Sequence, residues 1–237
     1  MIFLHEGLGS VAMWKDWPER VCDAARCRGL VFSRYGYGQS TPRPAAEKWP
    51  VTFMHDQARE VLPALFETLG IDVKRDRPVL FGHSDGGSIA LLYAAMYPQS
   101  VTGIVVAAPH VFVEDITIAH IERARQAYLQ TDLPIKLGRY HDDVASAFWG
   151  WNDIWLNPTF RDWNIQEYLP RIQCPALAMQ GLDDEYGTMA QIHSIHEAAP
   201  QTRLLEIPHC RHSPHIDQPD VVIRAIADFV DRLNKHD

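Results

Sequence analysis

The segment Gly82-His83-Ser84-Asp85-Gly86 has the form Gly-x-Ser-x-Gly and joins two stretches of different character. Arg77-Pro78-Val79-Leu80-Phe81 before it has the composition of a short buried strand, and the Ala- and Leu-rich stretch 88–97 after it has that of a helix. A sharp turn from strand to helix needs small residues on both sides of the serine, because the backbone crowds itself there. The segment therefore predicts a nucleophile elbow, in which Ser84 lies at a helix N-terminus whose free N–H groups favour negative charge.

Strand and helix patterns alternate along the rest of the chain, which predicts the α/β class, with a mostly parallel sheet flanked by helices. We expect strands at Ile2–Leu4, Leu30–Ser33, Pro78–Phe81, Val101–Ala107, Ala176–Gln180 and Arg203–Ile207. We expect helices at Ala12–Arg26, Phe53–Leu69, Asp85–Tyr97, Thr188–Ala199 and Pro219–Leu233.

The alternation stops between Pro109 and Pro170, where three or four helices broken by Pro134 and Pro158 are predicted. We therefore expect a helical cap at residues 110–170, inserted between the two parts of a core domain at 1–109 and 171–237. An insertion of this kind is expected over the carboxyl ends of the strands, where open α/β sheets bind ligands. Its tryptophans either join the insertion to the core or wall an apolar pocket; they are Trp149, Trp151, Trp155 and Trp163.

Composition excludes several classes of partner. The 237 residues carry a net charge of −8, which argues against nucleic acid and anionic membrane surfaces. No apolar run approaches the roughly 18 residues of a membrane span, and Met1 to Glu6 has no basic region typical of a signal peptide.

The chain has four cysteines and 12 histidines, and neither set indicates a metal site. No Cys-x-x-Cys pair occurs and the histidines are scattered, so we expect no metal. Cys22 and Cys27 could pair, but four reduced thiols in a cytoplasmic protein are the favoured interpretation.

Four blocks of sequence occur in an order that resembles the α/β-hydrolase fold family, in its esterase and meta-cleavage hydrolase branch. They are His5-Glu6-Gly7-Leu8-Gly9-Ser10, Tyr35-Gly36-Tyr37-Gly38-Gln39-Ser40, the Ser84 segment, and Gly181-Leu182-Asp183-Asp184 with His209-Cys210-Arg211-His212. The elbow together with the stretch 169–176 is also similar to the biphenyl-hydrolase-like group that includes amino-acid ester hydrolases. The resemblance covers nearly the whole chain but lacks the family's first two strands, so either the N-terminal hairpin is absent or the true start lies upstream of Met1.

The resemblance implies a catalytic triad in the order serine, acid, histidine. A serine hydroxyl needs a general base, and the base needs a carboxylate that holds its tautomer. Ser84 is then the nucleophile and His212 the base. The acid follows the strand Ala176–Gln180, with Asp184 preferred and Asp183 as the alternative.

The resemblance also places the backbone N–H groups of Gly7 and Asp85 in an oxyanion hole. The family commonly has glycine where this chain has Glu6, whose carboxylate either faces the site or turns away into a salt bridge. The Asp85 carboxylate either binds a cationic group of the substrate or suits the helix dipole. His110, Trp149, Trp151 and Trp155 complete the expected substrate-binding set.

We therefore expect a serine hydrolase that cleaves carboxylic esters of small to medium acyl groups through an acyl-enzyme, with a preference for α-amino esters as a sharper hypothesis. The alternatives are a carbon–carbon bond hydrolase acting on meta-cleavage products, a lactonase, a thioesterase, or a ligand-binding protein on a hydrolase scaffold. No cofactor is implied. The apolar insertion could equally serve as the surface of a homodimer.

Overall fold

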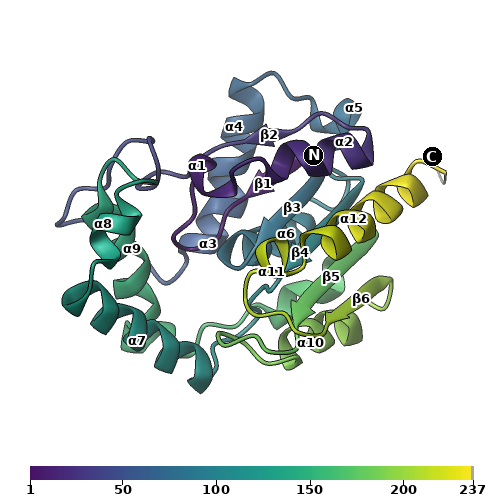
Figure 1. Cartoon of the computed structure of the whole chain (residues 1–237). Coiled ribbons are helices and arrows are strands. Elements are labelled where there is room, and N and C mark those ends of the chain that lie inside the picture. Colours follow the sequence, from purple (N-terminus) through teal and green to yellow (C-terminus); the bar gives the residue numbers. More distant parts are fainter. Residues whose placement is uncertain (236–237) are drawn as a thin grey trace.

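A single sheet of six parallel strands runs through the centre of the molecule (Figure 1). The computed structural model describes residues 1–235. The strand order is β2-β1-β3-β4-β5-β6, with β1 (Ile2–Leu4), β2 (Leu30–Val31), β3 (Val79–His83), β4 (Gly103–Ala107), β5 (Ala176–Gly181) and β6 (Thr202–Ile207). The α/β class and the six strands are confirmed, and the sheet formed by residues 1–235 contains no antiparallel hairpin.

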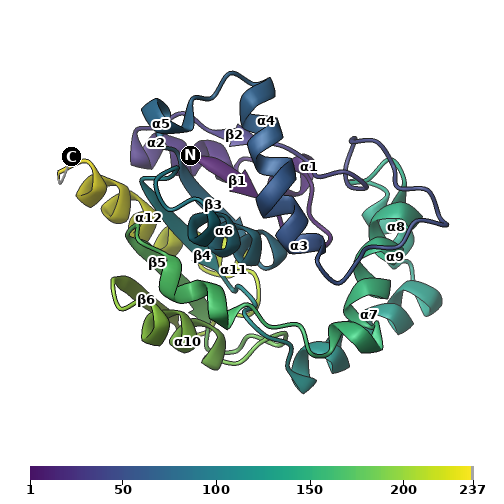
Figure 2. The same cartoon turned by 180° about the vertical axis from the view of Figure 1, so that it is seen from behind.

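Helices cover both faces of the sheet (Figures 1 and 2). One face carries α1 (Val11–Trp14), α2 (Trp17–Ala25), α11 (Pro214–Asp217) and α12 (Pro219–Leu233). The other carries α3 (Phe53–Asp56), the π-helical turn η1 (Gln57–Val61), α4 (Leu62–Thr68), α6 (Asp85–Met96) and α10 (Ala190–Ala198). A short helix, α5 (Val73–Asp76), precedes β3 and was not expected from the sequence.

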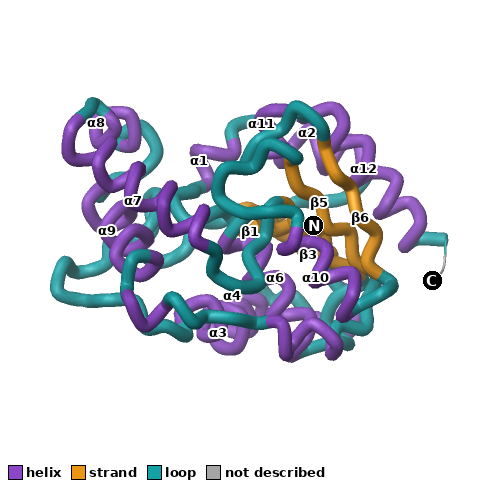
Figure 3. Tube along the Cα trace, turned by 90° about the horizontal axis from the view of Figure 1, so that it is seen from below, coloured by secondary structure: helices purple, strands orange, loops and turns teal. Residues whose placement is uncertain are grey.

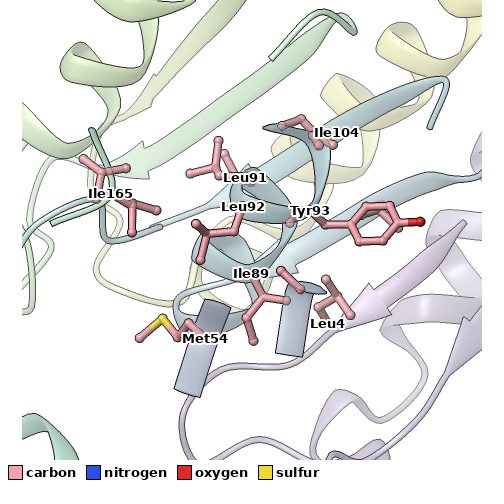
Figure 4. Packing of buried hydrophobic residues seen from close by; sticks show 14 of the residues in the cluster. Leu4, Met54, Ile89, Leu91, Leu92, Tyr93, Ile104 and Ile165 are labelled. Atoms are coloured by element: carbon pink, nitrogen blue, oxygen red, sulfur yellow. The ribbon is translucent and has the colours of Figure 1, made fainter. Parts of the chain in front are cut away.

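Helix α6 lies at the centre of the larger core, and every residue from Asp85 to Ala95 is buried. Its apolar side chains pack between the sheet and the outer helices, as Figure 4 shows for Ile89, Leu91 and Leu92. Each such side chain contributes about 1.5–3 kcal/mol when fully buried. This helix begins directly after Ser84, so the core fixes the position of the serine.

Two of the expected long helices depart from a regular α-helix, each near a proline. The helix predicted at Ala12–Arg26 divides into α1 and α2 at Lys15, whose φ is +53°. In a continuous helix the Pro18 ring would clash with the carbonyl of Trp14. The helix predicted at Phe53–Leu69 stays continuous, but it passes through the π-helical turn η1 just before Pro63.

The segment between β4 and β5 is helical, as predicted. It contains α7 (Asp115–Gln130), α8 (Leu133–Leu137), α9 (Val144–Trp155) and the 3₁₀ turns η2 (Pro158–Phe160) and η3 (Gln166–Arg171). Its helices α7, α8 and α9 group on one side of the strands (Figure 3). Pro134 lies in the first turn of α8 and Pro158 begins η2, where the missing N–H of proline costs nothing.

Candidate active site

Ser84 occupies the turn between β3 and α6 and has a φ of +51°, a strained conformation for a residue with a side chain. The glycines on either side permit the turn. A Cβ on Gly82 would lie 2.2 Å from the carbonyl oxygen of Gly86, and a Cβ on Gly86 would lie 2.1 Å from that of Leu4. The predicted elbow is thus present, and its geometry depends on the absence of both side chains.

Three side chains from separate parts of the chain form a continuous series of hydrogen bonds at this turn. The Nε2 atom of His212 lies 3.0 Å from the Oγ atom of Ser84. The Nδ1 atom of His212 lies 2.9 and 3.1 Å from the two carboxylate oxygens of Asp184. This is the arrangement in which a carboxylate orients an imidazole and the imidazole accepts a proton from a hydroxyl.

The loop after β5 holds Asp184 inward and leaves Asp183 exposed. The Tyr186 amide donates a hydrogen bond of 2.8 Å to Asp184 Oδ1. Burial alone would raise the pKa of Asp184, but the charge and hydrogen bond of His212 outweigh it and hold that pKa below its ordinary value. Asp184 is therefore ionised at neutral pH, as an orienting carboxylate must be.

The loop that follows β1 holds the Glu6–Gly7 peptide in a fixed orientation. The Glu6 carbonyl oxygen accepts hydrogen bonds from His5 Nδ1 at 2.7 Å, the Gly9 amide at 3.0 Å and Arg34 Nη2 at 3.1 Å. In a trans peptide the N–H points away from the C=O. Pinning the carbonyl therefore directs the Gly7 N–H to the opposite side, and Gly7 lines the same pocket as Ser84.

The Glu6 carboxylate faces His83, the residue before the serine. His83 Nδ1 lies 3.4 Å from Glu6 Oε2, and His83 Nε2 donates to the carbonyl oxygen of His212 at 2.8 Å. Burial would lower the pKa of His83, but the hydrogen bond and charge of Glu6 raise it, while His83 lowers the pKa of Glu6. The structure thus combines both expectations for Glu6, because the residue lines the pocket and also pairs with a histidine.

The Asp85 carboxylate is buried beside the serine, with 1% of the residue exposed. Its Oδ1 accepts a hydrogen bond of 3.2 Å from Trp155 Nε1, and its Oδ2 lies 4.0 Å from Arg34 Nη2. Oδ2 has no hydrogen-bond partner within residues 1–235. Burial raises the pKa of Asp85 to about 6, although the charge of Arg34 opposes the shift.

A pocket of about 130 Å³ opens beside these groups. Its lining includes Glu6, Gly7, Ser84, Asp85, His110, Trp151, Trp155 and His212, all of them expected from the sequence. Burial lowers the pKa of His110 to about 3, so this imidazole faces the pocket uncharged at neutral pH.

Four further lining residues were not expected: Leu8, Thr117, Ile121 and Tyr186. Thr117 and Ile121 lie four residues apart on α7, and this spacing puts them on one helix face. Arg34 was also missed, although its place directly after an expected strand end was a usable signal.

The structure does not place Trp149 in this pocket. Trp151 and Trp155 are four residues apart on α9 and share the face toward Ser84, whereas Trp149 is two residues before Trp151 and points to a separate cleft. Trp163 packs against Phe160 behind Trp155. The expectation that Trp149 binds substrate beside Ser84 is therefore corrected by helical periodicity.

Within residues 1–235, no group of three or more His, Cys, Asp or Glu side chains is arranged to hold a metal ion. The same part of the chain has no helix both long and apolar enough to cross a membrane.

Comparisons with known proteins match this chain to one family. The model of the alpha/beta hydrolase family matches residues 1–225. The human serine hydrolase BPHL is 30% identical over 206 residues, covering 85% of this chain and 68% of the relative. A proline iminopeptidase of Saccharolobus solfataricus is 22% identical, covering 86% and 76% of the two chains. Among solved structures, a carboxylesterase of Nitrososphaera gargenis superposes with a TM-score of 0.78 at 18% identity, covering 100% of this chain and 91% of that one. The chain belongs to the alpha/beta hydrolase family.

Proposed function

We propose that this hydrolase cleaves carboxylic esters of small to medium acyl groups, with Ser84 as the nucleophile. The observation that carries the proposal is the continuous series of hydrogen bonds Ser84–His212–Asp184, which opens into a pocket shared with Gly7 and Asp85. The pocket volume of about 130 Å³ suits a small acyl group rather than a polymer. The four free thiols support a cytoplasmic protein.

In this mechanism Ser84 Oγ attacks the ester carbonyl carbon while its proton passes to His212 Nε2, 3.0 Å away. The backbone N–H groups of Gly7 and Asp85 stabilise the negative oxygen of the tetrahedral intermediate. His212 then gives its proton to the departing alkoxide, which leaves an acyl-enzyme. A water molecule, deprotonated by His212, attacks the acyl carbon and releases the acid and the serine.

Asp85 carries the finer part of the proposal, a preference for α-amino esters. Asp85 lines the pocket, and its Oδ2 is buried and lacks a hydrogen-bond partner among the described residues. A substrate ammonium would supply both a donor and the opposite charge. Glu6 adds a second carboxylate to the same wall, so the pocket favours cations over anions.

Hydrolysis of p-nitrophenyl butyrate and of its α-amino counterpart tests the nucleophile, with wild type compared with Ser84→Ala. We expect turnover that Ser84→Ala abolishes while circular dichroism shows an unchanged fold. A serine-directed phosphonate should label wild type and not the variant. Turnover retained by purified Ser84→Ala would refute the assignment, and the absence of turnover and labelling in wild type would favour a binding protein on this scaffold. Labelling without ester turnover would favour carbon–carbon bond hydrolysis.

The same pair of substrates tests Asp85. We expect Asp85→Ala to raise KM for the α-amino ester at least tenfold, because this substrate loses its ion pair with the carboxylate. The KM for the neutral ester, which forms no ion pair, should stay within about twofold of the wild-type value. An equal loss on both substrates would show that Asp85 acts on the fold or the oxyanion hole and not on the ammonium.

A further inference from the structure

A second cleft, larger than the Ser84 pocket, lies on the outward side of α9. Its volume is about 380 Å³, and its walls include Arg43, Lys48, Trp49, Arg125, Trp149 and Asp153. None of its lining residues contributes to the Ser84 pocket. Helix α9 separates the two spaces, with Trp151 and Trp155 facing inward and Trp149 facing outward.

Positive charge is concentrated around this cleft in a chain whose net charge is −8. Asp153 is the carboxylate of the wall, and it pairs with Lys48 at 2.6 Å. Within residues 1–235, neither Arg43 nor Arg125 has a carboxylate at salt-bridge distance. Two guanidinium groups of this wall therefore lack a counter-anion.

The missing counter-anion is most unfavourable at Arg43, because only 4% of this residue is exposed to solvent. Its Nη1 donates to the carbonyl oxygens of Pro44 and Glu47, and its Nε has no hydrogen-bond partner among the described residues. Burying a cation without an opposite charge is unfavourable, and a bound anion would offset that cost.

The two tryptophans of the cleft provide flat apolar surfaces next to the cations. The Arg43 guanidinium lies 5.9 Å from the centroid of the Trp49 ring, and that of Arg125 lies 5.9 Å from the Trp149 ring. A ligand with a flat ring could lie against an indole while its anionic oxygens reach a guanidinium.

We propose that this cleft is a second small-molecule site, which binds an anionic compound with a flat aromatic body, such as an aromatic carboxylate. Its charge is opposite to that of the Ser84 pocket, where Glu6 and Asp85 disfavour anions. The two sites therefore select ligands of different charge.

Calorimetric titration of the full chain with 1-naphthoate tests the proposal, with neutral 1-naphthylmethanol and cationic 1-naphthylmethylammonium as matched probes. We expect saturable binding of naphthoate to the unlabelled protein. The three probes are then compared on protein labelled by a serine-directed phosphonate, which blocks the Ser84 pocket and its carboxylates. This protein should still bind naphthoate, and it should bind both other probes at least tenfold more weakly. A failure of labelling would count against the proposed function and not against this cleft. No saturable binding, or equal binding of the three probes, would overturn the proposal.

Two substitutions locate the bound anion. Arg125→Met should weaken naphthoate binding about tenfold, whereas Arg139→Met, the same change at an exposed arginine outside the cleft, should leave it within twofold. Asp153→Asn removes the carboxylate of the wall and should tighten binding severalfold. Equal effects of the two arginine substitutions would place the anion elsewhere.

Discussion

Asp183 and Asp184 are adjacent carboxylates in very different surroundings. Asp184 is 9% exposed and contacts His212, whereas Asp183 is exposed to solvent. An asparagine at 184 would no longer hold the imidazole in the tautomer that accepts the serine proton. We expect Asp184→Asn to lower kcat on the butyrate ester by about 10³–10⁴-fold, and Asp183→Asn to change it less than about twofold. A comparable loss in both variants would contradict this assignment of the acid.

The raised pKa of Asp85 gives the proposed preference for α-amino esters a pH dependence. Above pH 6 this carboxyl is ionised and attracts an ammonium; below pH 6 it becomes neutral and the attraction is lost. The KM for the α-amino ester should therefore rise about tenfold per pH unit below 6, relative to the KM for the neutral ester. The ratio cancels any effect of pH that is common to the two substrates. In Asp85→Ala the ratio should not depend on pH, and a pH-independent ratio in wild type would exclude the ion pair.

At the scale of elements, the π-helical turn η1 shows how one proline is accommodated. Pro63 cannot donate the N–H that would bond to the carbonyl of Arg59, four residues earlier. That carbonyl instead accepts a hydrogen bond of 2.9 Å from the hydroxyl of Tyr97, at the end of α6. The hydroxyl thus replaces a helical hydrogen bond and joins two elements of the core.

Tyr97→Phe should lower the free energy of unfolding by about 0.5–1.5 kcal/mol, because the Arg59 carbonyl then loses the hydrogen bond from this hydroxyl. Urea denaturation followed by circular dichroism measures the change. Tyr168→Phe is the control, since the Tyr168 hydroxyl makes no hydrogen bond within the described chain; we expect a change below about 0.3 kcal/mol there. Equal stabilities of the two variants would show that water replaces the Tyr97 hydroxyl without loss.

The sequence predicted the strands better than the helix boundaries, for a physical reason. A buried parallel strand is a short apolar run that ends at a turn, and all six such runs are strands in the structure. The break at Lys15 depends on where Pro18 meets the preceding turn. In the π-helical turn, the carbonyl of Arg59 is bonded by the hydroxyl of Tyr97, 34 positions after Pro63. Such long-range compensation leaves no local pattern.

At the scale of the whole molecule, the site also contains some residues that the sequence predicts and others that only the folded structure reveals. The resemblance to the family was sufficient to expect that Ser84, His212 and either Asp184 or Asp183 meet. In the structure Ser84, His212 and Asp184 do meet, and each follows the carboxyl end of a strand at one edge of the sheet. The contacts of Arg34 follow from how separate segments pack, which no single motif contains. The outward direction of Trp149 follows from helical periodicity once the packing of α9 shows which of its faces is turned toward Ser84. The insertion is therefore the part whose contribution the sequence specifies least.

The insertion packs against the loop that follows β1, which we propose to supply an oxyanion N–H and call the oxyanion loop, and one of these contacts can be tested directly. A Cβ on Gly7 would lie 2.1 Å from Cδ1 of Trp151, so α9 packs directly against the backbone of that loop. Gly7→Ala should force the Gly7 N–H out of position and lower kcat by about 10²-fold, the typical loss of one oxyanion donor. Trp151→Leu removes the clashing ring, so the double variant Gly7→Ala/Trp151→Leu should recover activity relative to Gly7→Ala, and a double-mutant cycle on kcat measures the coupling. Trp149→Leu lies on the same helix but faces the outer cleft, and it should give no recovery. Purely additive losses in the Gly7–Trp151 cycle would mean that the insertion does not set the position of the oxyanion loop.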